Sequence, residues 1–308
     1  MRRAAAAKPA PGGARPGRTP RGPTPTALRA LHPAAARWIG ALICMTAPHP
    51  ALTQILDVIE RMQEVPYRTN FVLLGEPGTG KEGLARALHH LTCPDGPLVR
   101  LDVGGFSDDD ALLALRGSGK DEGAARRANG GTLLIEEAAG LGPRTQAALI
   151  RLLKSGRLDP KSQGDDDGDA SPRRLHVNAI AMSDTELPAE VAAGRFRHDL
   201  YWRLARIVLT LPPLRERKQD ITPAAIWMGN RILREAGLSH DLVMTEDLDR
   251  LPAAERANAI ELKRDAVAAL EEQEWQGNLR ELETVLERAL LLYREGNALD
   301  AKAVRAAR

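Results

Sequence analysis

The sequence predicts an α/β fold, in which helices cover both faces of a parallel β-sheet and a small all-α domain follows the sheet. Up to about residue 211, short apolar runs alternate with segments whose apolar residues recur at helical spacing. This alternation is typical of a parallel sheet with crossover helices. After Pro212 and Pro213 the strand-like runs stop and helical spacing continues. A glycine-rich string between the first predicted strand and the next helix indicates a phosphate site on this sheet.

Composition divides the chain into three predicted parts. Residues 1–39 are rich in Ala, Pro, Gly and Arg and have no apolar periodicity, so we expect a disordered basic tail. Residues 40–222 carry the α/β pattern, and residues 223–308 are the predicted helical domain. The net charge is +2, and residues 1–38 alone contain eight basic residues and no acidic one. The rest of the chain is therefore mildly acidic and offers no broad basic surface for nucleic acid.

The elements of the sheet and its helices follow from the spacing of apolar residues. An amphipathic helix is predicted first, because Leu52, Ile55, Leu56, Ile59 and Met62 recur at helical spacing. The run at 71–74 is short, apolar and bounded by a turn, as buried strands are. By the same criteria, further strands are predicted at 98–103, 132–135, 176–182 and 207–211, and further helices at 82–90, 111–115, 146–153, 223–236 and most of 258–295.

The glycine-rich string is a predicted P-loop, because it follows a strand and precedes a helix. Glycines let the backbone approach a phosphate closely, and the amides of the loop and of the helix N-terminus point at that phosphate. The lysine supplies a positive charge toward the β- and γ-phosphates of ATP. The next residue is Glu82, where P-loops usually carry a Ser or Thr that contacts magnesium. The predicted loop consists of Gly75, Glu76, Pro77, Gly78, Thr79, Gly80 and Lys81.

Other residue clusters favour structural roles. The chain has two cysteines, Cys44 and Cys93, which imply no disulfide framework and favour a reducing cytoplasm. Cys93 with the nearby His89 and His90 would supply only three zinc ligands, so we expect no zinc site. The run 165–169 contains four aspartates but no glutamate closes a calcium loop, so a solvated loop is expected. No apolar run approaches the roughly 20 residues of a membrane helix, and we expect no membrane span.

Five stretches, in the same order, resemble the AAA+ module of sigma-54-dependent transcriptional activators. In that family the P-loop reads GE-x-GTGKE, so Glu82 is part of the resemblance. The likeness covers roughly residues 43–295. The stretches are the P-loop with its helix (GEPGTGKEGLARALH, 75–89), a Walker B segment (GGTLLIEE, 130–137), an arginine-finger segment (GRFRHDLYWRL, 194–204), a signature segment (LPPLRERKQDI, 211–221) and a sensor II segment (WQGNLREL, 275–282).

The resemblance implies a role for each matching residue. Glu137 would be the general base that activates water, and Glu136 would hold Mg²⁺. Arg197 and Arg203 match the positions that reach the ATP of a neighbouring subunit, which implies a homo-oligomeric ring. For these two arginines an ordinary surface salt bridge is the alternative. Asp184 aligns with the sensor I asparagine, and Arg280 aligns with the sensor II arginine of the lid.

The chain also differs from the family pattern. The string GAFTGA, through which the family contacts sigma-54, does not occur, and only five residues separate Gly117 from Gly123 at its place. The Walker B aspartate is replaced by Glu136, the switch asparagine by Asp102 and the sensor I asparagine by Asp184. Each change adds a carboxylate or shifts one near a polyanionic ligand, where like charges repel. We also expect no C-terminal helix-turn-helix and no sequence-specific DNA binding.

Two functions therefore remain open. The first is an ATP-dependent, ring-forming transcription regulator of the sigma-54 activator type, with ATP and Mg²⁺ as cofactors and altered partner contacts. The second is a nucleotide-binding regulatory or scaffold subunit that hydrolyses little ATP and does not contact sigma-54. A third possibility, DNA binding through the basic tail, predicts salt-sensitive binding that is lost when residues 1–38 are deleted.

Overall fold

The computed structural model describes residues 50–64, 68–119, 121–158 and 174–308. The predicted basic tail, Cys44 and the acidic run at 165–169 lie outside these residues. Among the described helices, none is both long enough and apolar enough to cross a membrane.

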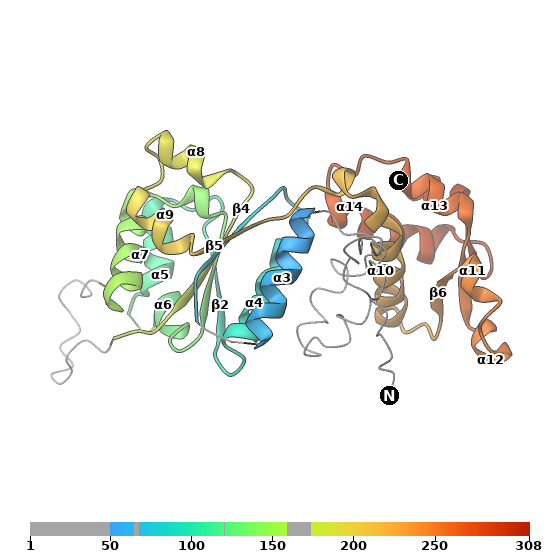
Figure 1. The fold of residues 1–308 in the computed structure, drawn as a ribbon, viewed down its shortest axis with the longest axis horizontal. Helices are drawn as coiled ribbons and strands as arrows, with labels where there is room; N and C mark the ends of the chain where they lie inside the picture. The colour runs from blue at the N-terminus through green and yellow to red at the C-terminus, as the bar shows by residue number, and fades with distance from the viewer. Residues whose placement is uncertain (1–49, 65–67, 120, 159–173) are drawn as a thin grey trace, which may run out of the picture.

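Five parallel strands form the central sheet, as predicted, in the order β2-β3-β4-β1-β5 (Figure 1). Strand β1 (Phe71–Leu74) lies between β4 and β5 and is buried along its whole length. Successive side chains of a strand point to opposite faces, so Phe71 and Leu73 join one core cluster whereas Val72 and Leu74 join another. The remaining strands are β2 (Leu98–Asp102), β3 (Thr132–Glu136), β4 (Asn178–Ser183) and β5 (Ile207–Thr210).

Helices cover both faces of the sheet, again as predicted (Figure 1). Helices α3 (Pro50–Glu64) and α4 (Lys81–Thr92) pack on one face. The helical spacing in α3 places Leu52, Ile55 and Ile59 in the core of that face. The other face is covered by α5 (Asp108–Arg116), α6 (Gly123–Arg127), α7 (Pro143–Ser155), α8 (Leu187–Ala192) and α9 (His198–Leu204).

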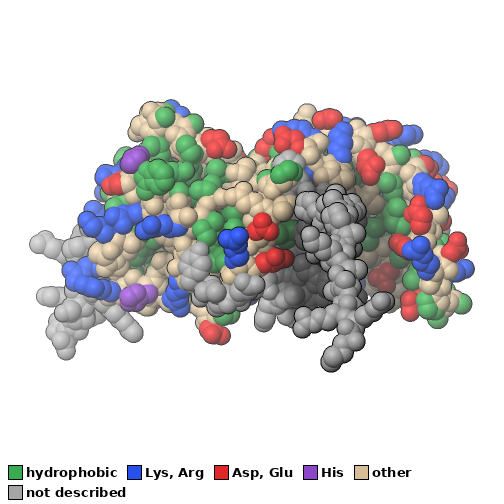
Figure 2. Space-filling view, in the orientation of Figure 1, with side chains coloured by type: hydrophobic (Ala, Val, Ile, Leu, Met, Phe, Trp, Pro, Cys, Tyr) green, Lys and Arg blue, Asp and Glu red, His purple; other side chains and the backbone are tan. Residues whose placement is uncertain are grey.

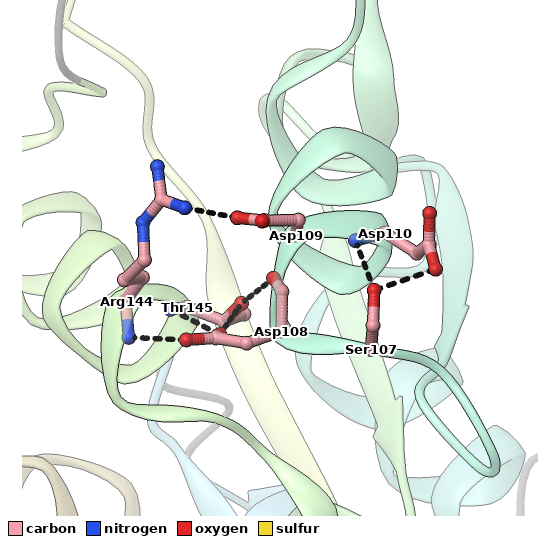
Figure 3. A network of polar contacts seen from close by, with 6 residues as sticks. All are labelled: Ser107, Asp108, Asp109, Asp110, Arg144 and Thr145. Atoms are coloured by element: carbon pink, nitrogen blue, oxygen red, sulfur yellow. Dashed lines mark hydrogen bonds and ion pairs between the residues drawn. The ribbon is translucent and has the colours of Figure 1, made fainter.

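A polar network joins α5 to the N-terminus of α7 (Figure 3). The Asp108 carboxylate accepts hydrogen bonds from the Arg144 amide at 2.8 Å and from the Thr145 amide at 3.0 Å. The Thr145 hydroxyl donates to the same carboxylate at 2.7 Å. Helix α7 is preceded by Gly142, which has no side chain to cap it, so a residue of another helix satisfies its first amides. The network fixes α7 against α5 on this face of the sheet.

The C-terminal region is mainly helical, as predicted, but the expectation that no strand follows residue 212 is wrong. A second, three-stranded parallel sheet has the order β6-β7-β8. Its strands are only four, four and two residues long, too short to leave an alternating pattern that distinguishes them from helix. The elements of this region are α10 (Ile221–Glu235), β6 (Asp241–Met244), α11 (Thr245–Leu248), α12 (Ala253–Arg256), β7 (Ala259–Leu262), α13 (Arg264–Glu271), α14 (Asn278–Arg288), the π-helical turn η4 (Ala289–Tyr293), β8 (Ala298–Leu299) and α15 (Ala301–Ala306).

This C-terminal region packs directly against the loop that follows β1. The Leu279 amide of α14 donates to the Gly78 carbonyl at 3.0 Å. Apolar side chains of α10, α13 and α14 belong to the same core cluster as those of α3 and α4. The two parts of the molecule therefore share one core beside the predicted P-loop, and the functional site lies where they meet.

Candidate functional site

The predicted P-loop connects the end of β1 to the start of α4. Gly75, Gly78 and Gly80 have φ angles of 145°, 78° and 105°, which side chains rarely adopt. A Cβ on Gly78 would also lie 2.3 Å from the Gly277 carbonyl oxygen, so a glycine is required there. The fully buried Thr79 donates its hydroxyl to the Glu76 carbonyl at 2.8 Å. These contacts hold the loop in a closed turn over the N-terminus of α4.

Lys81 is the first residue of α4, and its ammonium group lies within the turn. It donates hydrogen bonds to the Gly75 carbonyl and, at 2.9 Å, to the Glu76 carbonyl. Burial lowers the pKa of Lys81 from its ordinary value, and the Arg280 guanidinium lowers it further. No side chain caps the N-terminus of α4, so its first amides are free to bind an anion.

A cavity of about 1020 Å³ opens beside Lys81, between the sheet and the C-terminal helices. It is as large as the upper range of ordinary ligand pockets. Of the predicted site residues, Gly75, Glu76 and Thr79 do not line it, and neither do Arg197 and Arg203. The predicted residues that do line the cavity are Pro77, Gly78, Gly80, Lys81, Glu82, Glu136, Glu137, Asp184 and Arg280.

Three carboxylates of the cavity, those of Glu136, Glu137 and Asp184, come from the ends of the parallel strands, where ligands of open α/β sheets bind. Glu136 is the last residue of β3, and Glu137 follows it with a φ of 51°. The Glu137 carboxylate lies against Gly104, since a Cβ there would be 2.7 Å from its Oε2. Asp184 follows β4 and is exposed. Asp102, at the end of β2, accepts a hydrogen bond from the Gly104 amide at 3.0 Å.

Arg100 is a residue of this site that the sequence reasoning missed. Its Nε lies 2.6 Å from Oε1 of Glu136, and its Nη2 donates to Oε2 at 3.0 Å. Its Nη1 also donates to Glu82 at 3.3 Å, and Glu82 pairs in addition with Arg86. A signal was present in the sequence, because Arg100 precedes Asp102 by two residues and therefore shares its face of the strand.

The P-loop is held in place by hydrogen bonds from two other segments, Leu211–Ile221 and Trp275–Leu282. Glu76 accepts two hydrogen bonds from Arg215, at 2.6 and 2.8 Å, and one from Asn278 at 3.2 Å. These bonds, that from Arg215 above all, lower the pKa of Glu76 to about 2. The fully buried Asn278 also donates to the Pro77 carbonyl at 3.0 Å. The buried Arg217 donates to the Thr79 carbonyl at 3.0 Å. The signature segment and the sensor II segment of the sequence analysis thus fix the conformation of the P-loop through these hydrogen bonds.

Of the two predicted finger arginines, Arg197 directly precedes α9 and Arg203 lies within it, and neither lines the cavity of its own chain. Arg197 is exposed and makes two hydrogen bonds to the Asp199 carboxylate, both at 3.0 Å. Arg203 is half-buried, and its carbonyl accepts a hydrogen bond from Asn70 at 2.9 Å. Their position leaves the finger role a prediction.

The histidine and cysteine cluster makes ordinary hydrogen bonds. His89 Nδ1 lies 2.9 Å from the Thr132 hydroxyl, and the Asn178 amide donates to the Cys93 sulfur at 3.1 Å. Burial lowers the pKa of His89 to about 4, so its ring is neutral near pH 7. Among the described residues, no group of three or more His, Cys, Asp or Glu side chains is arranged to hold a metal ion.

Two family models match this chain. The sigma-54 interaction domain matches residues 45–210, and the AAA+ ATPase lid domain matches residues 241–307. The first match covers more than half of the chain and contains β1 to β5 with the P-loop. The second contains the small sheet and helices α13, α14 and α15.

Relatives of the chain include two regulatory proteins and one solved structure. The Nif-specific regulatory protein of Klebsiella pneumoniae is 33% identical over 82% of this chain and 45% of its own length. The hydrogenase transcriptional regulatory protein HoxA of Cupriavidus necator is 32% identical over 80% of this chain and 48% of its own. The crystal structure of NtrX from Brucella abortus in complex with ATP is 26% identical, with a TM-score of 0.66, and covers 83% of this chain and 53% of that one. The chain thus spans about half the length of these relatives. Because the family model covers more than half of the chain, and the P-loop, the strand-end carboxylates and the lid are all present, the chain belongs to the sigma-54 interaction domain family of AAA+ proteins.

Proposed function

We propose that the chain binds ATP in the cavity beside Lys81 and hydrolyses it, as a regulator of transcription in the cytoplasm. The observation that carries this proposal is the convergence of Lys81, Glu137 and Arg280 on one cavity from three separate segments. The complex of NtrX with ATP supports it, because that protein shares this fold. The phosphates would bind at the N-terminus of α4, where the free amides and Lys81 favour an anion.

Lys81 would change partners when ATP binds. Its hydrogen bonds to the carbonyls of Gly75 and Glu76 hold it inside the loop, and the phosphate oxygens would replace those carbonyls. Arg280, which lines the cavity from α14, would bind the γ-phosphate and bring the lid toward the sheet. Glu137 would accept the proton of the attacking water.

The carboxylates present suit Mg²⁺ as a cofactor. Magnesium prefers oxygen ligands and is usually held by one or two carboxylates together with phosphates and water, so a three-carboxylate cage is not needed. Glu136 would hold the ion, and Asp184 would lie close to the phosphates. When bound, magnesium neutralises charge on the β- and γ-phosphates.

We further propose that the chain forms a homo-oligomeric ring, in which α9 contacts the nucleotide of the next subunit. Arg203 lies on this helix beside Trp202, whose side chain is 59% exposed, and Arg197 directly precedes the helix. Figure 2 shows hydrophobic side chains at the surface in the region of α8 and α9. Exposed aromatic and arginine side chains are enriched at protein interfaces. An arginine that reaches the nucleotide of an identical neighbour requires head-to-tail packing, which closes into a ring.

A second candidate function is a nucleotide-binding regulatory subunit with little hydrolysis. Two observations favour it: Glu136 is already paired with Arg100, and Asp102 and Asp184 stand where the family has asparagines. The connection between α5 and α6 is also a tight turn, closed by a bridge between Ser118 and Asp121. In this candidate the chain would join a ring without a sigma-54 contact at that turn.

ATP turnover by the purified chain separates the two candidates. We expect the wild-type protein to hydrolyse ATP and Glu137→Gln to bind ATP while losing hydrolysis by about 10²–10⁴-fold, the usual contribution of a general base. Arg144→Gln, on the exposed surface of α7, is the matched control and should hydrolyse ATP like the wild type. Equal turnover in the wild type and Glu137→Gln would exclude the enzyme. Tight ATP binding without turnover in the wild type would establish the second candidate.

A further inference from the structure

Arg100 lies on the edge strand β2 and reaches the carboxylate that ends the neighbouring strand. Asp102 is the residue directly opposite Glu136 in the β2–β3 pair. Arg100 stands two residues before Asp102 and so projects from the same face of the sheet. Its long side chain, 52% exposed, extends along that face to Glu136, which is only 17% exposed.

The Arg100 guanidinium lies against both oxygens of the Glu136 carboxylate and forms a hydrogen bond to one of them. Nε approaches Oε1 at 2.6 Å and Nη2 donates to Oε2 at 3.0 Å. Among the described residues Oε1 has no hydrogen-bond donor, so the ion pair rests on the one charge-assisted hydrogen bond to Oε2, a kind that is stronger than a neutral hydrogen bond. The third nitrogen of Arg100 donates to Glu82 at 3.3 Å, so Arg100 links Glu136 at the end of β3 to Glu82 on α4.

A magnesium ion and Arg100 need the same atoms. Both are cations, and both are satisfied by the oxygens of Glu136. Oε2 accepts a charge-assisted hydrogen bond at 3.0 Å and must give up that bond, or share it, before it serves the metal or the water bound to the metal. Glu137 has no described arginine partner, so the competition concerns Glu136 alone of the paired glutamates.

We propose that Arg100 is a positioning residue that competes with magnesium for Glu136 and raises the magnesium concentration needed to complete the nucleotide site. This inference rests on the proposed binding of ATP. Nucleotide binding would then depend on the magnesium concentration, because Glu136 is released only when magnesium is abundant enough to displace the Arg100 guanidinium.

The test is a magnesium titration of nucleotide binding by the full-length chain, which does not depend on turnover. A fluorescent N-methylanthraniloyl derivative of ATP is held at a fixed concentration, and magnesium chloride is added. We expect Arg100→Gln to lower the half-saturating magnesium concentration about fivefold, at the upper end of what a half-exposed ion pair contributes. Arg100→Lys keeps the charge but loses the guanidinium, and its shift should be smaller.

Controls separate competition at Glu136 from a general effect of charge. Arg144→Gln removes another exposed, ion-paired arginine, 64% exposed against 52% for Arg100, and should leave the titration unchanged. In a Glu136→Gln background, Arg100→Gln should have no further effect, because the shared partner is gone. An unchanged titration in Arg100→Gln, or an equal shift in Arg144→Gln, would overturn the inference, as would nucleotide binding that is independent of magnesium.

The same experiment distinguishes failure of this inference from failure of the proposed function. Lys81→Ala is titrated with the nucleotide in parallel. Undiminished binding in that variant would show that the fluorescent nucleotide does not use the P-loop, and both proposals would fall. Loss of binding in Lys81→Ala, together with an unchanged magnesium response in Arg100→Gln, would overturn only the role of Arg100.

Discussion

The two sides of the nucleotide cavity are built in different ways. On the side of the P-loop, the buried Asn278 and Arg217 of the C-terminal region donate hydrogen bonds to the loop, one of them to the Glu76 side chain. We call this set of hydrogen bonds the support of the loop. At the strand ends, Glu136 is held by the half-exposed Arg100, and Glu137 and Asp184 are exposed. Buried hydrogen bonds are costly to break, whereas exposed ion pairs contribute little.

This difference indicates a division of roles. The support keeps the glycine turn in the shape that a phosphate needs, and it is part of the folded structure itself. The strand-end carboxylates contribute little to the fold, so they are free to exchange partners when nucleotide and metal bind. We therefore expect substitutions in the support to act on stability, and substitutions among the carboxylates to act on chemistry.

The largest effect is expected where the C-terminal region touches the loop. In Gly78→Ala the new methyl group would lie 2.3 Å from the Gly277 carbonyl oxygen, at a φ of +78°. Backbone cannot move aside as a flexible side chain does, so the free energy of unfolding should fall by about 3 kcal/mol, as measured by urea denaturation.

Gly105→Ala is the matched control, because Gly105 has a similar φ of +73° and open space around it. Only the cost of the left-handed conformation remains there, about 1 kcal/mol. Equal losses of unfolding free energy in the two variants would show that the close contact between Gly78 and Gly277 does not affect stability. That result would contradict the stabilising role assigned to the packing of the C-terminal region on the P-loop.

A smaller effect, with a defined pH dependence, is expected at Glu76. Its pKa in the folded protein is lowered to about 2 from an ordinary 4.5, through hydrogen bonds from Arg215 first and Asn278 second. A carboxylate with a lowered pKa stabilises the fold above pH 4.5, and that contribution is lost as the pH falls from 4.5 toward 2. Since the side chain is 38% exposed, Glu76→Gln should cost only about 1 kcal/mol at pH 7.

Glu136→Gln removes the same charge on the other side of the cavity, so it sharpens the comparison. Its free energy of unfolding should stay within about 0.5 kcal/mol of the wild type. The measurement is denaturant unfolding of both variants between pH 3 and pH 7, where only the loss in Glu76→Gln should shrink toward low pH. A larger loss in Glu136→Gln than in Glu76→Gln would reverse the proposed division of roles.

The sequence predicted the large sheet well because each of its strands leaves a strong signal. The run at 71–74 is wholly apolar and wholly buried, and the same holds for most of β3 and β4. The small second sheet left no such signal, since β8 consists of Ala298 and Leu299 only. Its pairing with β7 is decided by packing between distant segments, which local patterns do not report.

For the site, the sequence predicted residue types better than partners. The P-loop glycines could be identified because each position demands a backbone conformation that only glycine adopts readily. Arg100 was missed because its role comes from register: it acts only once β2 and β3 pair with Asp102 opposite Glu136. Likewise, the pattern around Arg215 and Asn278 marked two segments as important, but only the structure shows that they meet at Glu76.

The measurement that tests the account most directly is equilibrium binding of ATP to the wild-type chain and to Lys81→Ala. The lysine would donate charged hydrogen bonds to the phosphates, so its loss should weaken binding about tenfold to a hundredfold. Arg144→Gln, far from the cavity, should bind ATP with the wild-type affinity. If Lys81→Ala binds ATP as tightly as the wild type, the cavity beside the P-loop is not the nucleotide site, and the central claim is contradicted.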